Sequence, residues 1–305
     1  MAAPDTHAAW IAVDWGTTNL RVWAMSADDE ILDHARSEDG MARLQPAEFE
    51  GALLRLVESW LGSDPVSVIA CGMVGARQGW IEAPYRAVPC TPLESGFATP
   101  AVRNPYLRVR VIPGLKQEDP PDVMRGEETQ IAGFLHENSG FDGVLCLPGT
   151  HTKWAHVSAG KVVGFQTFMT GENFALLAER SVLRHSIDRE SWDAQAFAEA
   201  VGDLLSRPER LGAKLFDIRA EELLHGQRGG GATATLSGAL LGVELAAARS
   251  YWRDRRVALV GATPLVDFYA KALELQGIAT EVVDGDRKTL TGLIAARHLI
   301  PETAP

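Results

Sequence analysis

The stretch Trp10–Met25, WIAVDWGTTNLRVWAM, decides the fold of this chain. It begins with a short apolar run, continues through the turn-forming DWGTTN, and alternates apolar with other side chains from Leu20 onward. Alternation with a period of two is typical of a β-strand that has one buried face. Together with Ile31–Arg36, which follows a further turn, the stretch predicts three consecutive strands, a β-meander.

A second stretch of the chain has the same order of features. Gly143–Leu147 is apolar, PGTHTK follows at residues 148–153, and Trp154–Val157 and Val162–Thr167 are predicted as two further strands. Two copies of this order indicate an internal repeat, which has to be considered before any other fold assignment. The alternative, two unrelated hairpins with glycine turns, stays open on this pattern alone.

Helices are predicted between and after the two meanders. Pro46–Leu61 carries apolar residues at helical spacing, and Val66–Cys71 has the continuous apolar character of a buried parallel strand. Beyond Thr170 the chain is predicted to be mostly helical. The expected helices there include Glu172–Ser186, Trp192–Leu205, Arg210–Leu224 and Thr235–Tyr251.

Length and charge narrow the class of protein. A chain of 305 residues predicts about two domains. The charged, proline-bearing segment Lys116–Asp122 is the expected crossing, which gives domains of residues 1–122 and 123–305. The net charge of −11 argues against nucleic acid as a partner, because such proteins carry basic surfaces.

Cysteine use and the N-terminus bear on the compartment. Three cysteines without CxxC spacing argue against a zinc site or a disulfide framework and favour a reducing compartment. Met1–Ala9 lacks the basic segment and apolar run of a signal peptide. No apolar stretch approaches the roughly 18 residues of a membrane span. We therefore expect a cytoplasmic protein with no membrane partner.

Both glycine- and threonine-rich turns follow a buried strand, which is a suitable place for phosphate. Glycine lets the backbone approach an anion, while threonine hydroxyls and backbone N–H groups donate hydrogen bonds. The candidate phosphate ligands are Gly16, Thr17, Thr18, Gly149, Thr150 and Lys153. For either turn alone the alternative is an ordinary hairpin, and for Lys153 it is a solvated lysine.

Two further positions fit a nucleotide site. Asp14, at a strand end, could hold Mg²⁺ directly or through water, because hard cations take oxygen ligands. Gly261 begins the turn GATP between the apolar strand Val257–Val260 and a predicted helix. Such a junction could pack against a base and ribose. The alternatives are an Asx turn at Asp14 and a generic β–α loop at Gly261.

A pair of carboxylates opens another predicted helix. Gly126-Glu127-Glu128 stands at its N-terminus, where the helix dipole favours glutamate, and that is a sufficient structural reason for one of them. The functional alternative is that one acts as the base for a substrate hydroxyl.

Together these segments resemble the superfamily of actin-like ATPases and sugar kinases. DWGTTNLRVW is similar to the first phosphate turn of that superfamily, LPGTHTKW to the second, and LVGATPLVDFYAKAL to the adenosine turn. The resemblance implies an α/β fold of two actin-like (ribonuclease H-like) domains, each a β-meander plus helices. It also implies an ATP cleft between the two domains.

Five blocks resemble, more specifically, the 2-dehydro-3-deoxygalactonokinase family. They are ACGMVGARQGWIEAPYRAVP (Ala70–Pro89), MRGEETQIAGFL, CLPGTHTKW, TFMTGENFALL and LSGALLGVE. The family implies ATP-dependent phosphorylation of the terminal (6-) hydroxyl of 2-dehydro-3-deoxy-D-galactonate in galactonate breakdown, with ATP and Mg²⁺. The implied partner is a small sugar acid, and a homodimer is one open expectation.

A looser resemblance implies the base. Glycerol- and pentulose-type kinases carry a Gly-Asp-Gln element, whose Asp is the base, at a similar distance before the second phosphate turn. Glu127 takes that place in this chain. Because glutamate is one methylene longer than aspartate, Glu128 stays an alternative.

The substrate carboxylate needs a cationic partner in so acidic a protein, and a guanidinium fork matches a carboxylate. Arg77 and Arg86 are the candidates, with Trp80 and Tyr85 as platforms for the sugar, while Arg21 is assigned to the ATP side. Two other functions remain open. One is a kinase of another small sugar or sugar acid, and the other is a non-catalytic nucleotide-binding regulator.

Overall fold

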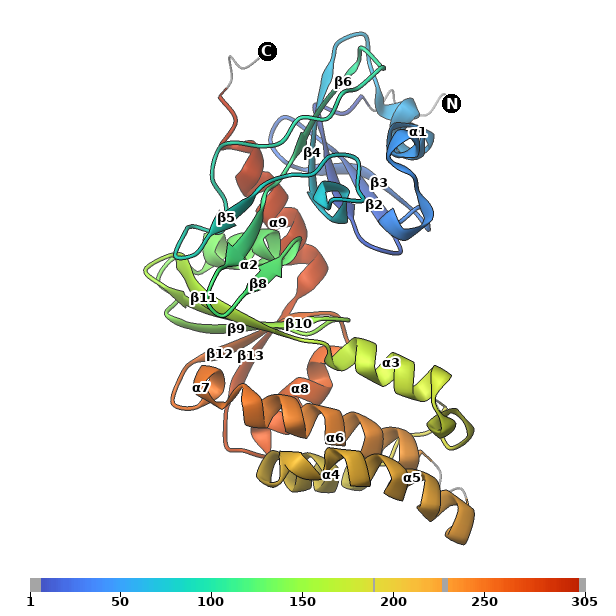
Figure 1. Cartoon of the computed structure of the whole chain (residues 1–305). Helices are drawn as coiled ribbons and strands as arrows, with labels where there is room; N and C mark the ends of the chain where they lie inside the picture. The colour runs from blue at the N-terminus through green and yellow to red at the C-terminus, as the bar shows by residue number, and fades with distance from the viewer. Residues whose placement is uncertain (1–6, 189, 227–229, 302–305) are drawn as a thin grey trace. The chain divides into compact units, whose positions relative to one another are not determined.

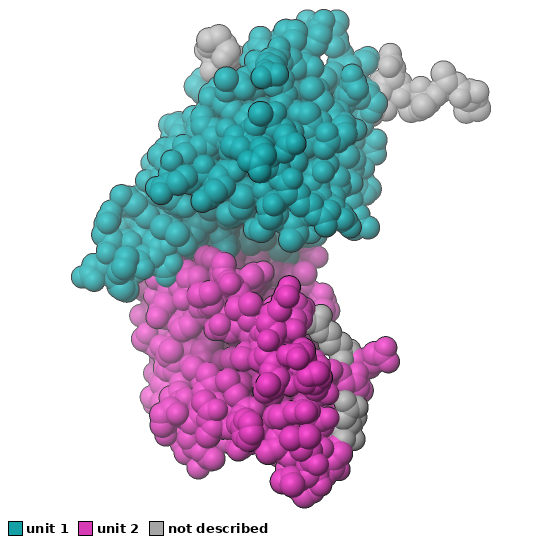
Figure 2. Space-filling model, turned by 45° about the vertical axis from the view of Figure 1, so that its right-hand side comes forward, with its two compact units in different colours: residues 1–141, 158–164, 285–305 teal, residues 142–157, 165–284 magenta. Residues whose placement is uncertain are grey.

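The computed structural model describes residues 7–188, 190–226 and 230–301. The first six residues, part of the segment in which no signal peptide is expected, lie outside this description. The chain forms two compact units (Figure 2). Unit 1 comprises residues 1–141, 158–164 and 285–305, and unit 2 comprises residues 142–157 and 165–284. The division of the two repeats at residue 122 stays a prediction.

The first meander forms part of a five-stranded sheet in unit 1. Its strands are β1 (Trp10–Trp15), β2 (Leu20–Met25), β3 (Ile31–Ser37), β4 (Val66–Gly72) and β6 (Leu107–Val111), in the spatial order β3-β2-β1-β4-β6. Strand β1 is antiparallel to β2 and parallel to β4, and β4 is parallel to β6. The predicted meander from Trp10 is confirmed.

The second meander forms a sheet with the same topology. Its strands are β9 (Gly143–Leu147), β10 (Thr152–Ser158), β11 (Lys161–Phe168), β12 (Val257–Gly261) and β13 (Thr280–Asp284), in the order β11-β10-β9-β12-β13. Strand β9 is antiparallel to β10 and parallel to β12, and β12 is parallel to β13. The internal repeat is therefore confirmed, and two unrelated hairpins are excluded.

The segment Lys116–Asp122 has a different role from the expected one. A small third sheet contains β5 (Tyr85–Ala87), β7 (Gly114–Gln117) and β8 (Asp122–Met124). Strands β7 and β8 are antiparallel neighbours, so the charged segment contains the turn of a hairpin, residues 118–121, inside unit 1. Charges and prolines suit an exposed hairpin turn as well as they suit a linker.

Both faces of the unit 1 sheet are buried. On one face, β1 side chains such as Ile11 and Val13 pack in the same cluster as Phe49 and Leu53 of α1 (Phe49–Val57). On the other face, Trp10 packs in a cluster with residues of α9 (Gly285–Arg297). Because successive side chains of β1 point to opposite faces of the sheet, they contribute to two apolar clusters, one with α1 and one with α9. The helix predicted over Pro46–Leu61 is shorter, with 3-10 turns on both sides of α1.

Helices α2 (Glu127–Glu137) and α9 lie side by side within unit 1 (Figure 1). A Cβ atom added to Gly133 would lie 2.0 Å from the carbonyl oxygen of Lys288, and one added to Gly292 would lie 2.0 Å from that of Thr129. Only glycine permits backbones this close. This packing fixes the N-terminus of α2, where Glu127 and Glu128 stand.

Unit 2 adds a helical layer to its sheet (Figure 1). Its helices are α3 (Thr170–Arg180), α4 (Ala194–Ser206), α5 (Leu211–His225), α6 (Gly231–Ala247), α7 (Arg249–Trp252) and α8 (Leu265–Glu274). Side chains of α4, α6 and α8 form one apolar cluster with β9, β10 and β12. The helix predicted over Thr235–Tyr251 begins four residues earlier and is divided at Ala248. Within the described ranges, no helix has the length and apolarity to cross a membrane.

Candidate active site

The first glycine- and threonine-rich turn joins β1 to β2. The Gly16 N–H donates to the carbonyl of Asn19 at 2.9 Å and closes the turn. The carbonyls of Gly16 and Thr17 accept hydrogen bonds from Met41 (3.0 Å) and Ala42 (2.9 Å), so the following segment supports the turn from behind. The side chains of Thr17 and Thr18 are exposed. Their hydroxyls are thus available to a ligand.

Charged side chains surround the base of this turn. Asp14 and Arg21 face each other across β1 and β2, and their side chains form an ion pair. The same guanidinium pairs with Asp286, in the first turn of α9. Burial raises the pKa of the Asp14 carboxyl, although Arg21 opposes the rise. Asp286 was missed by the sequence reasoning because nothing local connects it with Asp14.

These carboxylates fit a magnesium ion that arrives with phosphate. Across the described ranges, His, Cys, Asp and Glu side chains form no group of three or more that could enclose a metal. Magnesium at phosphate sites is usually held by one or two carboxylates together with phosphate oxygens and water. Asp14 and Asp286, which share Arg21, provide oxygen donors of this kind.

The N-terminus of α2 lies at the end of β4. A Cβ atom added to Gly126 would lie 3.4 Å from the Cα of Gly72. The buried Cys71 thiol donates to Oδ1 of Asp14 at 3.8 Å. Burial raises the pKa of Cys71 well above its ordinary value, and the charges of Asp14 and Glu128 add to the rise. The structure therefore brings Asp14 and the glutamate pair to one place, around Cys71.

The two glutamates differ in exposure. The side chain of Glu128 is 0% exposed, and its carboxylate accepts hydrogen bonds from the Gly126 N–H (2.7 Å) and the Thr129 hydroxyl (3.2 Å). Burial, and then the neighbouring Glu127 carboxylate, raise the pKa of Glu128 to about 7. Glu127 is half-buried and accepts from the Arg125 N–H at 3.1 Å. Of the two glutamates, Glu127 is therefore the more exposed.

The two arginines predicted to bind substrate already have protein partners. The Arg77 side chain is 80% exposed and pairs with Glu82 at 3.2 Å. Arg86 is largely buried and donates to the carbonyls of Thr91 (3.2 Å) and Pro92 (2.5 Å), which fixes that loop.

The two predicted sugar platforms also contact other side chains. The Trp80 ring packs against Trp15 and Phe49, with centroids 6.2 and 6.4 Å apart. The Tyr85 ring lies 4.3 Å from the guanidinium carbon of Arg125. Both rings are half-buried, so one part of each is covered and another is open.

Arg125 is a candidate that the sequence reasoning missed. It is 9% exposed and donates through Nη2 to the carbonyl of Ala83 at 2.7 Å. Within the described part of the chain, its Nε and Nη1 atoms have no hydrogen-bond partner. A buried cation with unused donors is costly unless an anion is near. Its position immediately before Gly126-Glu127-Glu128 is the sequence feature that could have identified Arg125 as a site residue.

The second turn, in unit 2, packs against the start of α3. A Cβ atom added to Gly171 would lie 2.4 Å from the carbonyl oxygen of Gly149. The Thr150 carbonyl accepts from the Glu172 N–H at 3.0 Å. Lys153 is only 6% exposed, and its Nζ donates to the carbonyl of His151 at 3.3 Å, so the solvated-lysine alternative is excluded.

An apolar hollow of about 630 Å³ lies beside the second turn. Its lining includes Gly149, Thr170, Gly171, Phe174, Trp192, Pro264, Leu265, Phe268 and Tyr269. The rings of Trp192 and Phe268 are stacked with centroids 4.4 Å apart. Gly261 lies beside the second turn, since a Cβ there would be 3.6 Å from the Pro148 carbonyl oxygen. An apolar hollow with aromatic walls next to a phosphate turn suits a purine base.

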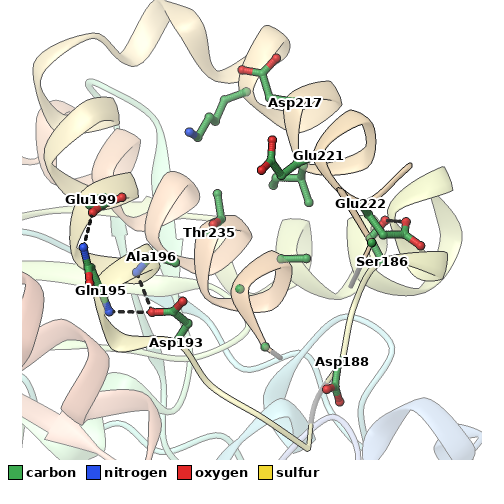
Figure 3. A pocket seen from close by; sticks show the side chains of 16 residues that line it. Ser186, Asp188, Asp193, Gln195, Ala196, Glu199, Asp217, Glu221, Glu222 and Thr235 are labelled. Atoms are coloured by element: carbon green, nitrogen blue, oxygen red, sulfur yellow. Dashed lines mark hydrogen bonds between the residues drawn. The ribbon is translucent and has the colours of Figure 1, made fainter. Parts of the chain in front are cut away.

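A second hollow in unit 2, of about 590 Å³, has the opposite character (Figure 3). Its lining carries six carboxylates and a single lysine, Lys214. The carboxylates belong to Asp188, Asp193, Glu199, Asp217, Glu221 and Glu222. Like charges repel a polyphosphate at such a wall. Of the two hollows, the apolar one therefore fits a nucleotide.

Comparison with known proteins agrees with this geometry. A family model described as 2-keto-3-deoxy-galactonokinase matches residues 14–296. A protein of Rhizobium meliloti (strain 1021) named "Probable 2-dehydro-3-deoxygalactonokinase DgoK1" is 38% identical over 97% of this chain and 98% of its own. The 2-dehydro-3-deoxygalactonokinase of Escherichia coli (strain K12) is 33% identical over 96% of this chain and 99% of its own.

A solved structure extends the similarity to three dimensions. The crystal structure of a 2-dehydro-3-deoxygalactonokinase-family protein from Sinorhizobium meliloti superimposes with a TM-score of 0.86. It is 37% identical to this chain and covers 96% of it and 99% of its own length. The family model, which matches residues 14–296, includes both Gly/Thr-rich turns and the second meander. The chain belongs to the 2-dehydro-3-deoxygalactonokinase family.

Proposed function

We propose that this chain is a kinase that transfers the γ-phosphoryl group of ATP to the terminal (6-) hydroxyl of 2-dehydro-3-deoxy-D-galactonate. The family match over residues 14–296 carries the proposal. The Escherichia coli relative, matched along almost the whole of both chains, is named for this activity. The geometry supports it with a Gly/Thr turn at the same place in each sheet.

This proposal assigns nucleotide contacts to each unit separately. Gly149, Thr150 and the buried Lys153 donate to phosphate oxygens, and the apolar hollow takes the base. Gly16, Thr17 and Thr18 act on the phosphates from the first turn, with Arg21 behind them. Asp14 and Asp286 would hold Mg²⁺, and the ion would supply neutralisation of phosphate charge.

Glu127 is the proposed base. Phosphoryl transfer depends mainly on positioning and charge neutralisation, so the base has only to accept the hydroxyl proton as the bond to phosphorus forms. Glu127 is half-buried, whereas Glu128 is fully buried. Glu128 instead satisfies the Gly126 N–H ahead of the helix.

An arginine is proposed to hold the substrate carboxylate. Arg77, Arg86 and Arg125 are the candidates, with Trp80 and Tyr85 as platforms for the carbon chain. Within the described residues, the Nε atoms of Arg86 and Arg125 and the Nη1 atom of Arg125 have no hydrogen-bond partner. Arg125 also lies against Tyr85 and directly precedes the glutamate pair.

The setting of the reaction completes the proposal. The cysteines Cys71, Cys90 and Cys146 are free thiols, as expected in a reducing compartment, and we propose a cytoplasmic location. A small sugar acid is the partner, with no role for nucleic acid or membrane. A homodimer is the oligomeric state to test first.

A substrate panel tests the function. ATP consumption is measured with 2-keto-3-deoxy acids derived from hexonates, with neutral ketoses and with glycerol, and ³¹P NMR locates the new phosphate. We expect turnover of 2-dehydro-3-deoxy-D-galactonate with phosphate on the 6-oxygen. The Glu127→Gln protein, purified in parallel, controls for contaminating kinases. Turnover of neutral sugars alone would indicate another sugar kinase, and nucleotide binding without turnover would indicate a regulator.

A further inference from the structure

One buried carboxylate in unit 2 connects segments that are far apart in the sequence. Glu244, on α6, is 2% exposed. It accepts hydrogen bonds from Nε1 of Trp154 at 2.7 Å and from the Tyr269 hydroxyl at 2.8 Å. The side chain of Thr170 also donates to it. Four stretches singled out in the sequence, LSGALLGVE, CLPGTHTKW, TFMTGENFALL and LVGATPLVDFYAKAL, thus meet at Glu244.

The direction of the hydrogen bonds extends the network to the phosphate turn. The Tyr269 hydroxyl has a single proton, which it donates to Glu244. Its oxygen lies 2.7 Å from Oγ1 of Thr152, so the Thr152 hydroxyl has to donate to Tyr269. Thr152 begins β10 directly after the second turn. The position of this residue therefore depends on Glu244 through one intermediate side chain.

The same donors form walls of the apolar hollow. Thr170 and Tyr269 both line it, the first from the start of α3 and the second from α8. The groups that act on Glu244 in the described part of the chain are neutral donors, and no cation is among them. A buried carboxylate balanced by three donors is sensitive to the loss of any one of them.

We propose that Glu244 is a positioning residue for the nucleotide: it holds Thr170 and Tyr269 in the walls of the apolar hollow and, through Tyr269, holds Thr152 at the end of the second phosphate turn. The inference rests on the proposed function, because it takes ATP as the occupant of the hollow. Glu244 lies behind the walls and acts through its partners.

Glu244→Gln tests the proposal, because it keeps the size of the side chain and removes its negative charge. Glutamine replaces one of the two accepting oxygens of Glu244 with an NH₂ group, which donates. The indole N–H of Trp154 can only donate, so it cannot accept a hydrogen bond from this group. We expect the dissociation constant of a non-hydrolysable ATP analogue, measured by calorimetry, to rise about 10- to 100-fold. KM for ATP rises with it, and KM for the sugar acid stays unchanged.

Trp252→Phe is the matched control. It removes another buried indole hydrogen bond, from Trp252 to the Leu245 carbonyl (2.8 Å), in the same core but outside the hollow's lining. We expect it to lower the melting temperature and to leave the affinity for the analogue unchanged. If Glu244 had only a structural role, Glu244→Gln would also lower the melting temperature and leave the affinity for the analogue unchanged.

Tyr269→Phe keeps the test decisive if Glu244→Gln does not fold. It removes only the hydroxyl between Glu244 and Thr152, and we expect weaker binding of the analogue with an unchanged KM for the sugar acid. In the double variant the two losses should not add, because they interrupt one network. Wild-type affinity in folded Glu244→Gln, or equal rises in both KM values, would overturn the inference. A wild-type protein that binds no nucleotide would overturn the proposed function, and the inference with it.

Discussion

The two Gly/Thr-rich turns have similar sequences and the same place in their sheets, yet different chemistry supports them. Behind the first, Arg21 joins the carboxylates of Asp14 and Asp286. Behind the second, neutral donors gather around Glu244, and an apolar hollow lies alongside. The repeat supplies the backbone of both turns, and the side chains give each a separate task. We propose that unit 1 supplies the carboxylates for metal and proton, and that unit 2 supplies the walls for a nucleoside.

The largest effect is expected at Glu127. Glu127→Gln keeps the shape and removes the charge of the proposed base, so kcat and kcat/KM should fall together by roughly 10²- to 10⁴-fold. Affinity for an ATP analogue, which we assign largely to unit 2, should stay near that of wild type. Glu128→Gln is the matched control and should lose much less activity. If the Glu128→Gln variant is inactive and the Glu127→Gln variant is active, Glu128 is the base.

A substitution of Asp14 tests whether the metal binds at the first Gly/Thr-rich turn. In Asp14→Asn the Mg²⁺ concentration needed for half-maximal rate should rise by at least about tenfold, since one carboxylate ligand is lost. Steady-state rates over a Mg²⁺ titration measure the effect, and circular dichroism checks the fold. Thr152→Val, directly after the second turn, should leave the Mg²⁺ requirement unchanged. Equal Mg²⁺ requirements in wild type and Asp14→Asn would remove Asp14 from the metal site.

The arginines of unit 1 test where the substrate carboxylate binds. Arg125→Met should raise KM for the sugar acid about tenfold or more, because a hydrogen-bonded charge pair is lost. The same change should have little effect on the weak turnover of the methyl ester, which lacks the charge. Arg86→Met and Arg77→Met, assayed in parallel, assign the role among the three. If Arg125→Met weakens acid and ester equally, Arg125 only supports the Ala83 loop.

The smallest effect is expected at Glu128, and it concerns the pH dependence of the free energy of unfolding. Its pKa is about 7 in the folded chain against 4.5 as the ordinary value, so the folded state holds an extra proton between these pH values. The free energy of unfolding should therefore fall as pH rises from 4.5 to 7, by about 3 kcal/mol at most. Glu128→Gln should reduce this fall, as measured by urea unfolding, while Glu244, whose pKa burial also raises to about 7, keeps its own share. Glu58→Gln, at an exposed site, should keep the wild-type slope.

Local pattern accounts for much of the fold. The alternation from Leu20 and the apolar run of Gly143–Leu147 predicted strands that the structure contains. The repeat predicted two β-meanders, and they hold the same place in both sheets. Composition is less specific at Lys116–Asp122, which was predicted as a crossing and contains the turn between β7 and β8, because exposed charged turns and linkers share one composition.

By itself, the sequence determined the two meanders, their turns and the Glu127–Glu128 pair, because spacing and periodicity act over a few neighbouring residues. Tertiary structure alone decided which side chains meet. Asp286 reaches Arg21, and Glu244 joins Trp154 and Tyr269, across separations of 25 residues or more. Burial, which covers Glu128 and leaves Glu127 half-open, is also set by distant packing. Partners and solvent exposure depend on chain segments that no local pattern relates, so only the fold could supply them.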